Sequence, residues 1–415
     1  MEQEDCTEYF DSAEEIEEKI KWVIDYVKDS KHLVIYTGAG ISTESGIIDY
    51  RGPKGIWTML KQGKEPVKSV PFIKFPTKCH MAISELYKQK KLKYLTSQNV
   101  DGLHLESGIS RDCMSEIHGN TNIEICKECE IEYVRDYSVR NNKEVHEHTT
   151  GRFCNKCGKE LFDTIVNFND PLDQKWFERA LEHSKLADVA IVLGTSLKVL
   201  PICDLPQLCK FNTYGHKGKL IIVNLQTTPK DIYADVKINM KTDEFMERLM
   251  NGLGYQIPTY VASKSYLLSI QKQQEELSFD CQFRSEKNGN RISSWFKNVS
   301  FKFLDSNNQE ISQTSIDKGE CKVNNIPLNT SSIIVSGILK LKSKPSEEDN
   351  DESYNVECQF TFPDIKLEGQ PIISPSENLI DLRHAFLAYR PDNFTLKTKT
   401  IIAAKSTTRN FIKGN

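Results

Sequence analysis

Four cysteines in the middle of the chain form the pattern with the clearest chemistry. They occur as two Cys-x-x-Cys pairs, Cys126 with Cys129 and Cys154 with Cys157. Each pair can present two thiolates from one tight turn, and two such pairs supply the four sulfurs of a tetrahedral zinc site. Since four ligands leave no open position on the metal, we predict one structural Zn²⁺ per chain. The alternative interpretation is a group of buried cysteines that hold no metal.

The segment between the two pairs also contains histidines. His146 and His148 are alternative zinc ligands, but four cysteines already complete a site, so we interpret both as exposed loop residues. Gly151 and Gly158 flank the second pair, where tight turns favour glycine.

A glycine-containing loop, TGAGISTESGIIDYRG at 37–52, follows a short apolar run. Gly38 and Gly40 are typical of a turn that lets the backbone approach a phosphate. The dinucleotide fingerprint is nevertheless incomplete, because Thr43 replaces the third glycine and residues 56–58 contain no ribose-binding acid. The loop therefore predicts a nucleotide site that differs from that of a hydride-transferring dehydrogenase.

His118 precedes the cysteine-rich insert, at its junction with a predicted sheet. A cleft between two parts of a protein forms at such a junction, and imidazole accepts protons near neutral pH. His118 is therefore a candidate general base, with a structural histidine as the alternative.

Polar residues also follow other predicted strands. Gln98, Asn99 and Asp101 form one such tip, which could bind a ligand or merely cap a turn. Residues 194–196, Gly-Thr-Ser, leave backbone N–H groups open to a phosphate, and residues 224–226, Asn-Leu-Gln, end a further strand. Ligands of open α/β sheets bind beyond the carboxyl ends of the strands, so we expect these tips to meet at one site.

The elements that carry these tips alternate between short apolar runs and helical patterns. Strands are predicted at 32–37, 93–98, 189–194 and 219–225, and helices at 12–29, 77–90, 172–184 and 243–251. Thr77 is the predicted N-cap of the second helix, and Gly252 is predicted to close the last one. This alternation predicts an α/β domain with a parallel sheet, interrupted at about 119–165 by the zinc-binding insert.

Beyond residue 265 the pattern changes to strands separated by Asn, Gly, Ser and Asp turns. We predict an all-β, sandwich-like C-terminal domain over 265–415, with an acidic solvated loop at 343–352. The preceding domains are expected at 1–30, an acidic segment with a helix, and at 31–264, the α/β domain.

Bulk properties narrow the class of protein. The chain has 415 residues and a net charge of −4, so the whole chain is not an electrostatic nucleic-acid binder. An acidic start and the lack of a long apolar run predict no secretion signal and no membrane span, hence a nuclear or cytoplasmic protein. A modest basic patch could contact chromatin or nucleic acid, although a solvated tail is the alternative; it comprises Lys397, Lys399, Lys405, Arg409 and Lys413.

Several motifs in their order resemble the sirtuins, the NAD-dependent protein-lysine deacylases: GAGIS, DYRG, SQNVDGLH, HGN, the two CxxC pairs, GTSLKV and VNLQ. The resemblance covers about residues 10–260, and details such as SLKVLP are similar to the class IV, nuclear branch. It implies a Rossmann-like domain with a small zinc module, and a cleft between them that holds NAD and an acyl-lysine.

The resemblance also implies roles for individual residues. The pyrophosphate of NAD would be contacted by Gly38, Ala39 and Gly40, with Ser42 lining the same pocket. Gly194, Thr195 and Ser196 would bind phosphate and ribose, Asn224 and Leu225 would bind the adenosine end, and Gln226 would also contact the cofactor. The nicotinamide and its ribose would be held by Gln98, Asn99 and Asp101 and covered by Asp49, Tyr50 and Arg51. The substrate peptide would lie on Val166, Asn167 and Phe168, and His118 would be the general base, assisted by Asn99 and Asp101.

The implied reaction joins the acyl oxygen to the ribose as nicotinamide leaves, and ends in free lysine and O-acyl-ADP-ribose. We therefore predict a deacetylase of histones or other nuclear proteins that is itself located in the nucleus, with the nucleolus as one expected site. The alternatives are a mono-ADP-ribosyltransferase that uses the same site and a chromatin scaffold with weak activity. Two departures from the family pattern are Ile48 in place of proline and Asn169-Asp170 in place of Gly-Glu.

Overall fold

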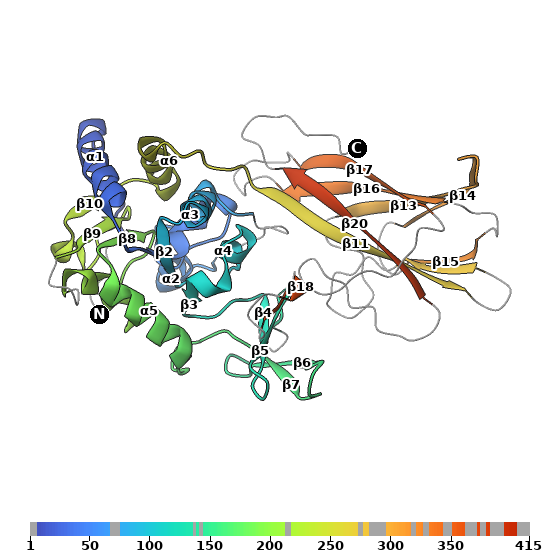
Figure 1. Ribbon diagram of the computed structural model, residues 1–415, viewed down its shortest axis with the longest axis horizontal. Helices are drawn as coiled ribbons and strands as arrows, with labels where there is room; N and C mark the ends of the chain where they lie inside the picture. Colours follow the sequence, from blue (N-terminus) through green and yellow to red (C-terminus); the bar gives the residue numbers. More distant parts are fainter. Residues whose placement is uncertain are drawn as a thin grey trace. The chain divides into compact units, whose positions relative to one another are not determined.

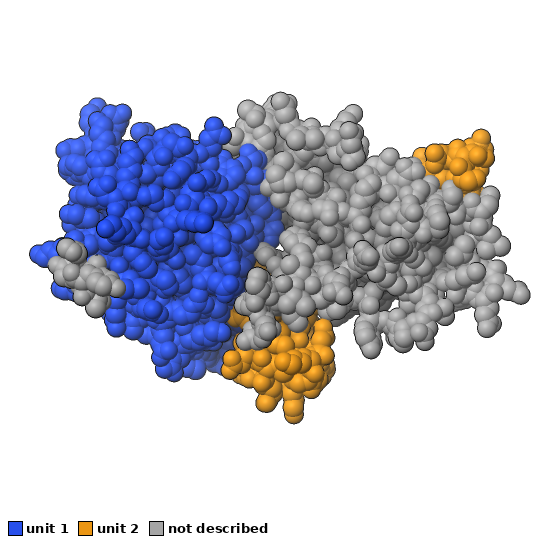
Figure 2. Space-filling model, in the orientation of Figure 1, with its two compact units in different colours: residues 1–121, 142–148, 163–260 blue, residues 122–141, 149–162, 261–415 orange. Residues whose placement is uncertain are grey.

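The computed structural model describes residues 6–66, 75–135, 138–140, 144–211, 217–272, 277–281, 296–316, 321–326, 332–342, 351–361, 372–373, 379–381 and 394–404. It divides into two compact units, coloured separately in Figure 2. Unit 1 comprises Met1–Thr121, Asn142–His148 and Asp163–Tyr260, and unit 2 comprises Asn122–Asn141, Thr149–Phe162 and Val261–Asn415.

A parallel sheet forms the centre of unit 1 (Figure 1). Among the described residues its strand order is β10-β9-β8-β1-β2-β3. The strands are β1 (Leu33–Thr37), β2 (Leu92–Ser97), β3 (Met114–Glu116), β8 (Val189–Leu193), β9 (Lys219–Val223) and β10 (Val236–Ile238). Both β1 and β8 are buried along their whole length, which explains why they are continuous apolar runs. Because every neighbouring pair of these strands is parallel, the carboxyl ends of the strands lie along one edge of the sheet.

Four of the described helices lie close to their predicted positions: α1 (Ala13–Asp29), α3 (Lys78–Lys88), α5 (Gln174–Leu186) and α6 (Thr242–Leu253). Two short helices were not predicted, α2 (Ile56–Lys61) and α4 (Leu103–Glu106). Of these helices, α1, α3 and α5 contact strands of the sheet. The Ser12 side chain caps α1, and Thr77 caps α3 as predicted. One buried cluster joins alternate strand residues to α5 and includes Val34, Tyr36, Ala190, Val192 and Ala180. The period of two places the remaining strand side chains on the opposite face.

Short 3₁₀ helices complete the loops of unit 1. They are η1 (Ala39–Ile41), η2 (Thr43–Ser45), η3 (Arg111–Cys113), η4 (Ile202–Asp204), η5 (Pro206–Phe211) and η6 (Asp231–Tyr233). The first two lie in the glycine-containing loop, and η5 packs against α5.

The predicted end of the last helix is wrong. Gly252 lies inside α6, and a Cβ at this position would come within 2.1 Å of Ile24 Cδ1 on helix α1. The helix ends instead at Gly254, whose φ of 77° is the left-handed conformation that commonly terminates helices. Glycine is thus required at position 252 because the two helices pack closely there, and it is favoured at position 254 because the backbone is left-handed.

Unit 2 contains the strands around the cysteine pairs and those beyond residue 260. The first group is β4 (Ile123–Cys126), β5 (Ile131–Val134), β6 (Thr149–Phe153) and β7 (Glu160–Asp163). Antiparallel pairs join β4 to β5 and β6 to β7.

The described residues beyond Tyr260 lie almost entirely in strands. The sheet order β15-β12-β11-β20 contains β11 (Val261–Lys272), β12 (Leu277–Cys281), β15 (Cys321–Ile326) and β20 (Phe394–Ala404). The order β14-β13-β16-β17 contains β13 (Phe296–Leu304), β14 (Glu310–Ile316), β16 (Ser332–Lys342) and β17 (Asp351–Thr361). Two short strands, β18 (Ile372–Ile373) and β19 (Leu379–Asp381), pair with each other, and β19 also pairs with β5.

Two predictions for this region fall partly outside the described residues. Of the acidic segment predicted as a loop, 343–350 lie outside them, and Asp351 already begins β17. Of the basic patch, Lys397 and Lys399 lie in β20, whereas 405, 409 and 413 are outside the described residues. Within the described chain, no helix combines the length and apolar character needed to cross a membrane.

Candidate functional site

The tips of β1 and β8 touch at the point where the strand order reverses. Gly38 N–H donates to Leu193 O at 3.0 Å, and Gly40 N–H donates to Gly194 O at 2.9 Å. A Cβ on Gly38 or Gly40 would come within 3 Å of the 194–195 segment. These glycines therefore allow two loops to approach closely at the reversal point, which is where ligands of open α/β sheets bind.

Substituting Gly194 by alanine tests this contact. Gly194 has a φ of 58°, and its Cβ would lie 2.8 Å from Gly40 C. Adding the left-handed strain to the clash, we expect Gly194→Ala to lower the free energy of unfolding by about 3 kcal/mol. Gly254→Ala is the matched control, because φ is 77° but the described residues place no atom beyond its own helix and chain neighbours within 4 Å of the new Cβ, so it should lose only about 1 kcal/mol. Equal losses in urea denaturation would contradict the close-contact explanation.

Asn99, Asp101 and Ser42 form one hydrogen-bonded group beside these glycines. The Ser42 hydroxyl donates to Asp101 Oδ2 at 2.7 Å, and Asn99 Nδ2 donates to Gly38 O at 3.1 Å and to Ser42 Oγ at 3.3 Å. Asp101 Oδ1 accepts from Leu103 N–H at 3.0 Å. Asp101 thus has the turn-capping role considered as the alternative, and it also faces the glycine loop. Sequence segments about sixty residues apart are brought together as predicted.

Gln98 links the tip of β2 to that of β8. Its Nε2 donates to Thr195 Oγ1 at 3.1 Å, and the same hydroxyl accepts from Leu197 N–H at 3.3 Å. Leu197 is buried and has a φ of 51°, an uncommon conformation for a branched apolar residue. Ser196, next to it, is partly exposed.

His118 follows β3 and lies against the tip of β2. Its Nδ1 is 3.0 Å from Gln98 O, and a carbonyl can only accept, so Nδ1 carries the proton. In the neutral ring Nε2 is then the proton acceptor. Burial lowers the pKa of His118, although the Gln98 hydrogen bond opposes that effect. The ring is thus held neutral in the tautomer that a general base requires.

The sequence analysis assigned no role to Thr37, Ser97 or His104, which are linked by hydrogen bonds to the backbone of Asn99. Thr37 Oγ1 donates to Ser97 Oγ at 3.0 Å and lies 2.9 Å from His104 Nε2, while Ser97 Oγ accepts from Asn99 N–H at 3.1 Å. Burial lowers the pKa of His104 to about 3. Thr37 and Ser97 end strands, as the other tip residues do, and that position was the available signal.

The 49–51 segment is fixed by backbone hydrogen bonds to the start of α2. Ile56 N–H donates to Asp49 O and Trp57 N–H donates to Tyr50 O, both at 2.9 Å. The Arg51 guanidinium lies 4.4 Å from the centre of the Trp57 ring. Burial raises the pKa of both Asp49 and Tyr50.

The tip of β9 is held by the end of β10. Asn224 O accepts from Lys237 Nζ at 3.0 Å and from Asn239 Nδ2 at 2.9 Å, and Leu225 O also accepts from Asn239. Gln226 Nε2 donates to Arg51 O at 3.0 Å and so joins this tip to the 49–51 segment. The sequence did not identify Lys237 or Asn239, because a three-residue strand is too short to show a period.

The 164–168 segment runs beside the residues that carry His118. Val166 N–H donates to His118 O at 3.0 Å, and a Cβ on Gly119 would lie 1.8 Å from Thr164 O. Phe168 is 61% exposed, and its ring centre is 5.3 Å from that of Trp57. Asn169 has a φ of 73°, so asparagine adopts here the left-handed conformation that favours glycine.

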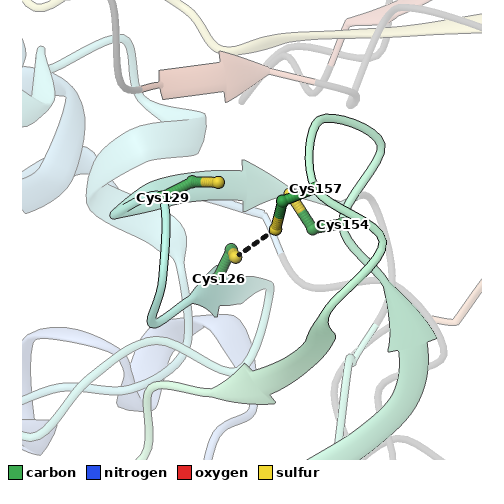
Figure 3. A group of neighbouring side chains, drawn as sticks. All are labelled: Cys126, Cys129, Cys154 and Cys157. Atoms are coloured by element: carbon green, nitrogen blue, oxygen red, sulfur yellow. Dashed lines mark hydrogen bonds between the residues drawn. The ribbon is translucent and has the colours of Figure 1, made fainter.

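The four cysteines converge in unit 2 (Figure 3). Their sulfurs lie within 4.8 Å of one another, with Cys126 and Cys157 at 3.5 Å. Tetrahedral zinc with Zn–S bonds of about 2.3 Å separates its sulfurs by about 3.8 Å, so the set fits one Zn²⁺. Gly158 closes a turn with a φ of 72°, as predicted, and its N–H donates to Cys154 O at 2.8 Å. The prediction of a tight turn is wrong for Gly151, which has a φ of 70° but lies inside β6, where the pairing with β7 shifts register.

Polar contacts brace the strands that carry these cysteines. The Tyr133 hydroxyl lies 3.2 Å from Cys154 Sγ and accepts from Asn155 N–H at 3.1 Å. The buried Glu124 carboxylate accepts from Arg135 Nε at 2.7 Å and from Arg152 Nε at 2.6 Å. Two arginines from different strand pairs thus share one buried acid.

The interpretation of both intervening histidines as exposed loop residues is wrong for His148. Its side chain is 22% exposed and contacts Asp163 and Asp170, whereas the His146 side chain is 61% exposed and contacts Asp170. The carboxylates that contact these rings are 15 to 24 residues away in sequence, so the spacing of the histidines does not predict the contacts.

Comparison with known proteins identifies relatives of this chain. The model of the Sir2 family matches residues 67–201. The NAD-dependent protein deacetylase sirtuin-7 of Mus musculus is 45% identical over 263 residues, which are 61% of this chain and 64% of the mouse protein. The matched region therefore spans slightly less than two thirds of that relative.

Two further relatives differ in how much of their length is matched. The NAD-dependent protein deacetylase SRT1 of Arabidopsis thaliana is 45% identical over 258 residues, 61% of this chain and 53% of the plant protein. The NAD-dependent protein deacetylase Sirt6 of Drosophila melanogaster is 38% identical over 263 residues, 61% of this chain and 81% of the fly protein.

Proposed function

The chain belongs to the Sir2 family, as its motifs predicted, and we propose from this premise that it is an NAD-dependent protein deacetylase. It removes acetyl groups from protein lysines and releases nicotinamide and O-acetyl-ADP-ribose. The names of the similar deacetylases support this activity, and the arrangement at the sheet edge provides the residues for it.

The observation that carries the proposal is the state of His118. Its Nδ1 is committed to Gln98 O, and burial lowers its pKa, so neutral Nε2 is available as a base at physiological pH. Bound NAD supplies the ribose that receives the acyl group, and His118 takes the proton from a ribose hydroxyl.

Neighbouring residues bind and orient the nucleotide. The glycine loop and the Thr195 tip receive the pyrophosphate, and Asn224, Leu225 and Gln226 receive the adenosine end. Asn99 and Asp101 hold the nicotinamide ribose, with Ser42 fixing the Asp101 carboxylate at 2.7 Å. The 49–51 segment, anchored to α2 and to Gln226, covers the nicotinamide.

Residues 166–168 bind the peptide that carries the acyl-lysine. This proposal is supported by the hydrogen bond from Val166 N–H to His118 O, which joins the segment to the residue proposed as the base. The four cysteines hold one Zn²⁺ per chain, whose role is to keep the strands of their module folded.

Histones or other nuclear proteins are the proposed substrates, and the nucleus is the proposed location. The proposed β-rich domain at 265–415 is supported by the antiparallel pairs among its described strands, of which β19 also pairs with β5 of the cysteine module. Its basic residues, including Lys397 and Lys399, could add contacts to chromatin.

An activity assay tests the proposal. The protein is incubated with acetylated histone peptides and NAD, and nicotinamide and O-acetyl-ADP-ribose are measured by mass spectrometry, with His118→Tyr as the inactive control. We expect one O-acetyl-ADP-ribose for each nicotinamide. If nicotinamide is released and ADP-ribose becomes attached to protein, with no O-acetyl-ADP-ribose formed, the protein is instead a mono-ADP-ribosyltransferase. No turnover, even with nucleosomes present, would favour a scaffold.

A further inference from the structure

The turn that follows the proposed peptide-binding segment is held by the carboxylate of Asp170. Asp170 Oδ2 accepts from Asn167 N–H at 2.8 Å and from Asn167 Nδ2 at 2.9 Å. Asp170 N–H donates back to Asn167 O at 3.1 Å, and Asn169 closes the turn with a φ of 73°. Asn169 and Asp170 are residues at which the chain departs from the family pattern, so the hydrogen bonds of this turn are made by residues that the family pattern does not contain.

His148 joins that carboxylate to a second one. Its Nε2 lies 3.2 Å from Asp170 Oδ2, and its Nδ1 lies 2.9 Å from Asp163 Oδ1. Each ring nitrogen of His148 therefore lies within hydrogen-bonding distance of a different carboxyl group, and the ring bridges the two acids. His146 Nδ1 approaches the other oxygen, Asp170 Oδ1, at 2.8 Å.

Both acids bind the backbone of the same short segment. Asp163 Oδ1 accepts from Ile165 N–H at 2.9 Å, and Asp170 Oδ2 accepts from Asn167 N–H. Between them, Val166 N–H donates to His118 O. Three consecutive N–H groups are thus fixed by one His–Asp network and by the backbone of the proposed base.

The charges favour this arrangement. The Asp163 side chain is 1% exposed and the Asp170 side chain 16% exposed, so both carboxyl groups depend on hydrogen-bond partners within the protein. Although partial burial opposes it, the hydrogen bonds from Asn167 and His146 lower the pKa of Asp170 overall. Charge-assisted hydrogen bonds of this kind are the stronger ones, and they reduce the freedom of the groups that they join.

We propose that Asp170 and His148 are positioning residues for the peptide substrate. They hold residues 165–167 in the conformation that receives the backbone of the acyl-lysine peptide, and they do not touch the reacting atoms. The inference rests on the proposed function only for the identity of that ligand. A peptide that binds an ordered segment does not have to order it first, which improves affinity.

Two variants and one matched control test the inference in the full chain. Asp170→Asn removes the charge of the carboxylate that joins His148 to Asn167, and His148→Gln replaces two ring nitrogens on opposite sides by a single amide nitrogen. Asp173→Asn is the control, because Asp173 lies three residues further on and its carboxylate accepts from Lys175 N–H and Trp176 N–H in the first turn of α5. Asparagine is also a good N-cap, so this helix should be preserved.

Hydrogen exchange reads the conformation without requiring activity. In Asp170→Asn we expect the amides of Ile165 and Asn167 to exchange about tenfold faster, since a lost charge-assisted hydrogen bond corresponds to at least this factor. His148→Gln should accelerate the same amides by a smaller factor, and Asp173→Asn should leave them as in the wild type. Exchange that is unchanged in both Asp170→Asn and His148→Gln overturns the inference.

Steady-state kinetics with an acetylated histone peptide then separate positioning from general damage. We expect Asp170→Asn to raise the KM for the peptide about tenfold, with the KM for NAD and the melting temperature near those of the control. Equal increases in both KM values, or the same effect in Asp173→Asn, would overturn the positioning role. If the wild type turns over no acetylated peptide, the proposed function fails, while faster exchange in the variants would still support the network.

Discussion

Replacing His118 by glutamine is expected to lower the turnover number for deacetylation about a thousandfold. Glutamine can still donate to Gln98 O, as His118 Nδ1 does now at 3.0 Å, so the side chain stays in place. It offers no nitrogen that can accept a proton, and the general-base contribution is lost. Single-turnover deacetylation of an acetylated peptide measures the effect, and binding of NAD, followed by calorimetry, should be retained.

The pH dependence of the wild type should carry the same signature. The proposed base, His118, can accept a proton only when neutral, so activity should be lost as the pH falls through its pKa. Because burial lowers that pKa, the acidic limb of kcat/KM should lie below the value of about 6.5 for an ordinary histidine. The Gln98 hydrogen bond moves the pKa in the opposite direction and limits the shift. In His118→Gln the residual activity should lose this limb.

His183→Gln is the matched control for the loss of a half-buried imidazole. His183 lies on α5, where its ring stacks on Tyr94 at 4.0 Å and its Nδ1 is 3.0 Å from His32 Nε2. It belongs to none of the strand tips, so its loss should leave the turnover number near that of the wild type. A His118→Gln enzyme with normal turnover would show that another group takes the proton.

Strand positions could be predicted because the signal is local. The runs at 32–37 and 189–194 are apolar throughout, and the corresponding strands β1 and β8 are buried along their whole length. Thr77 was recognised as a cap because a hydroxyl before an apolar period has one common use. By contrast, β3 and β10 have three residues each, which cannot establish a period.

The sequence predicts which strand ends meet at the candidate site, but it does not predict the hydrogen bonds between them. Parallel strands end at one edge, and this alone indicated that Gly38, Asn99 and Thr195 would meet. Which partner each would choose depends on packing between distant segments. The contact of Gly40 with Gly194 and the bridge from His148 to Asp163 and Asp170 have no local signature. The prediction for His148 is wrong for this reason: a histidine in a polar loop is expected to be exposed, and only the structure shows that Asp163 and Asp170 contact the ring.

The error at Gly252 has a related cause. Glycine after an apolar period indicates a helix end, but the same residue type also permits close helix packing. Only the position of Ile24 on α1 distinguishes the two uses. Sequence patterns therefore reveal that a glycine is required more readily than they reveal why.

Replacing Cys126 by serine is expected to remove the zinc and abolish deacetylation. The four sulfurs converge within 4.8 Å, and structural zinc contributes about 10–16 kcal/mol to the folding of small domains. That contribution exceeds the free energy of unfolding of most domains, so the module should unfold once a ligand is lost. Metal analysis should give one zinc per wild-type chain and much less than one in the variant. Chelator treatment of the wild type should reproduce both effects.

Cys113→Ser separates the loss of zinc from the loss of any thiol. Cys113 lies in η3, and its Sγ is 3.4 Å from Lys93 O, outside the four-cysteine group. This control should keep one zinc and wild-type activity. Because no ligand position is left open by four sulfurs, the zinc should act on folding and not on the reaction itself. A Cys126→Ser enzyme that lacks zinc but retains normal turnover and thermal stability would therefore exclude the structural role assigned to the metal.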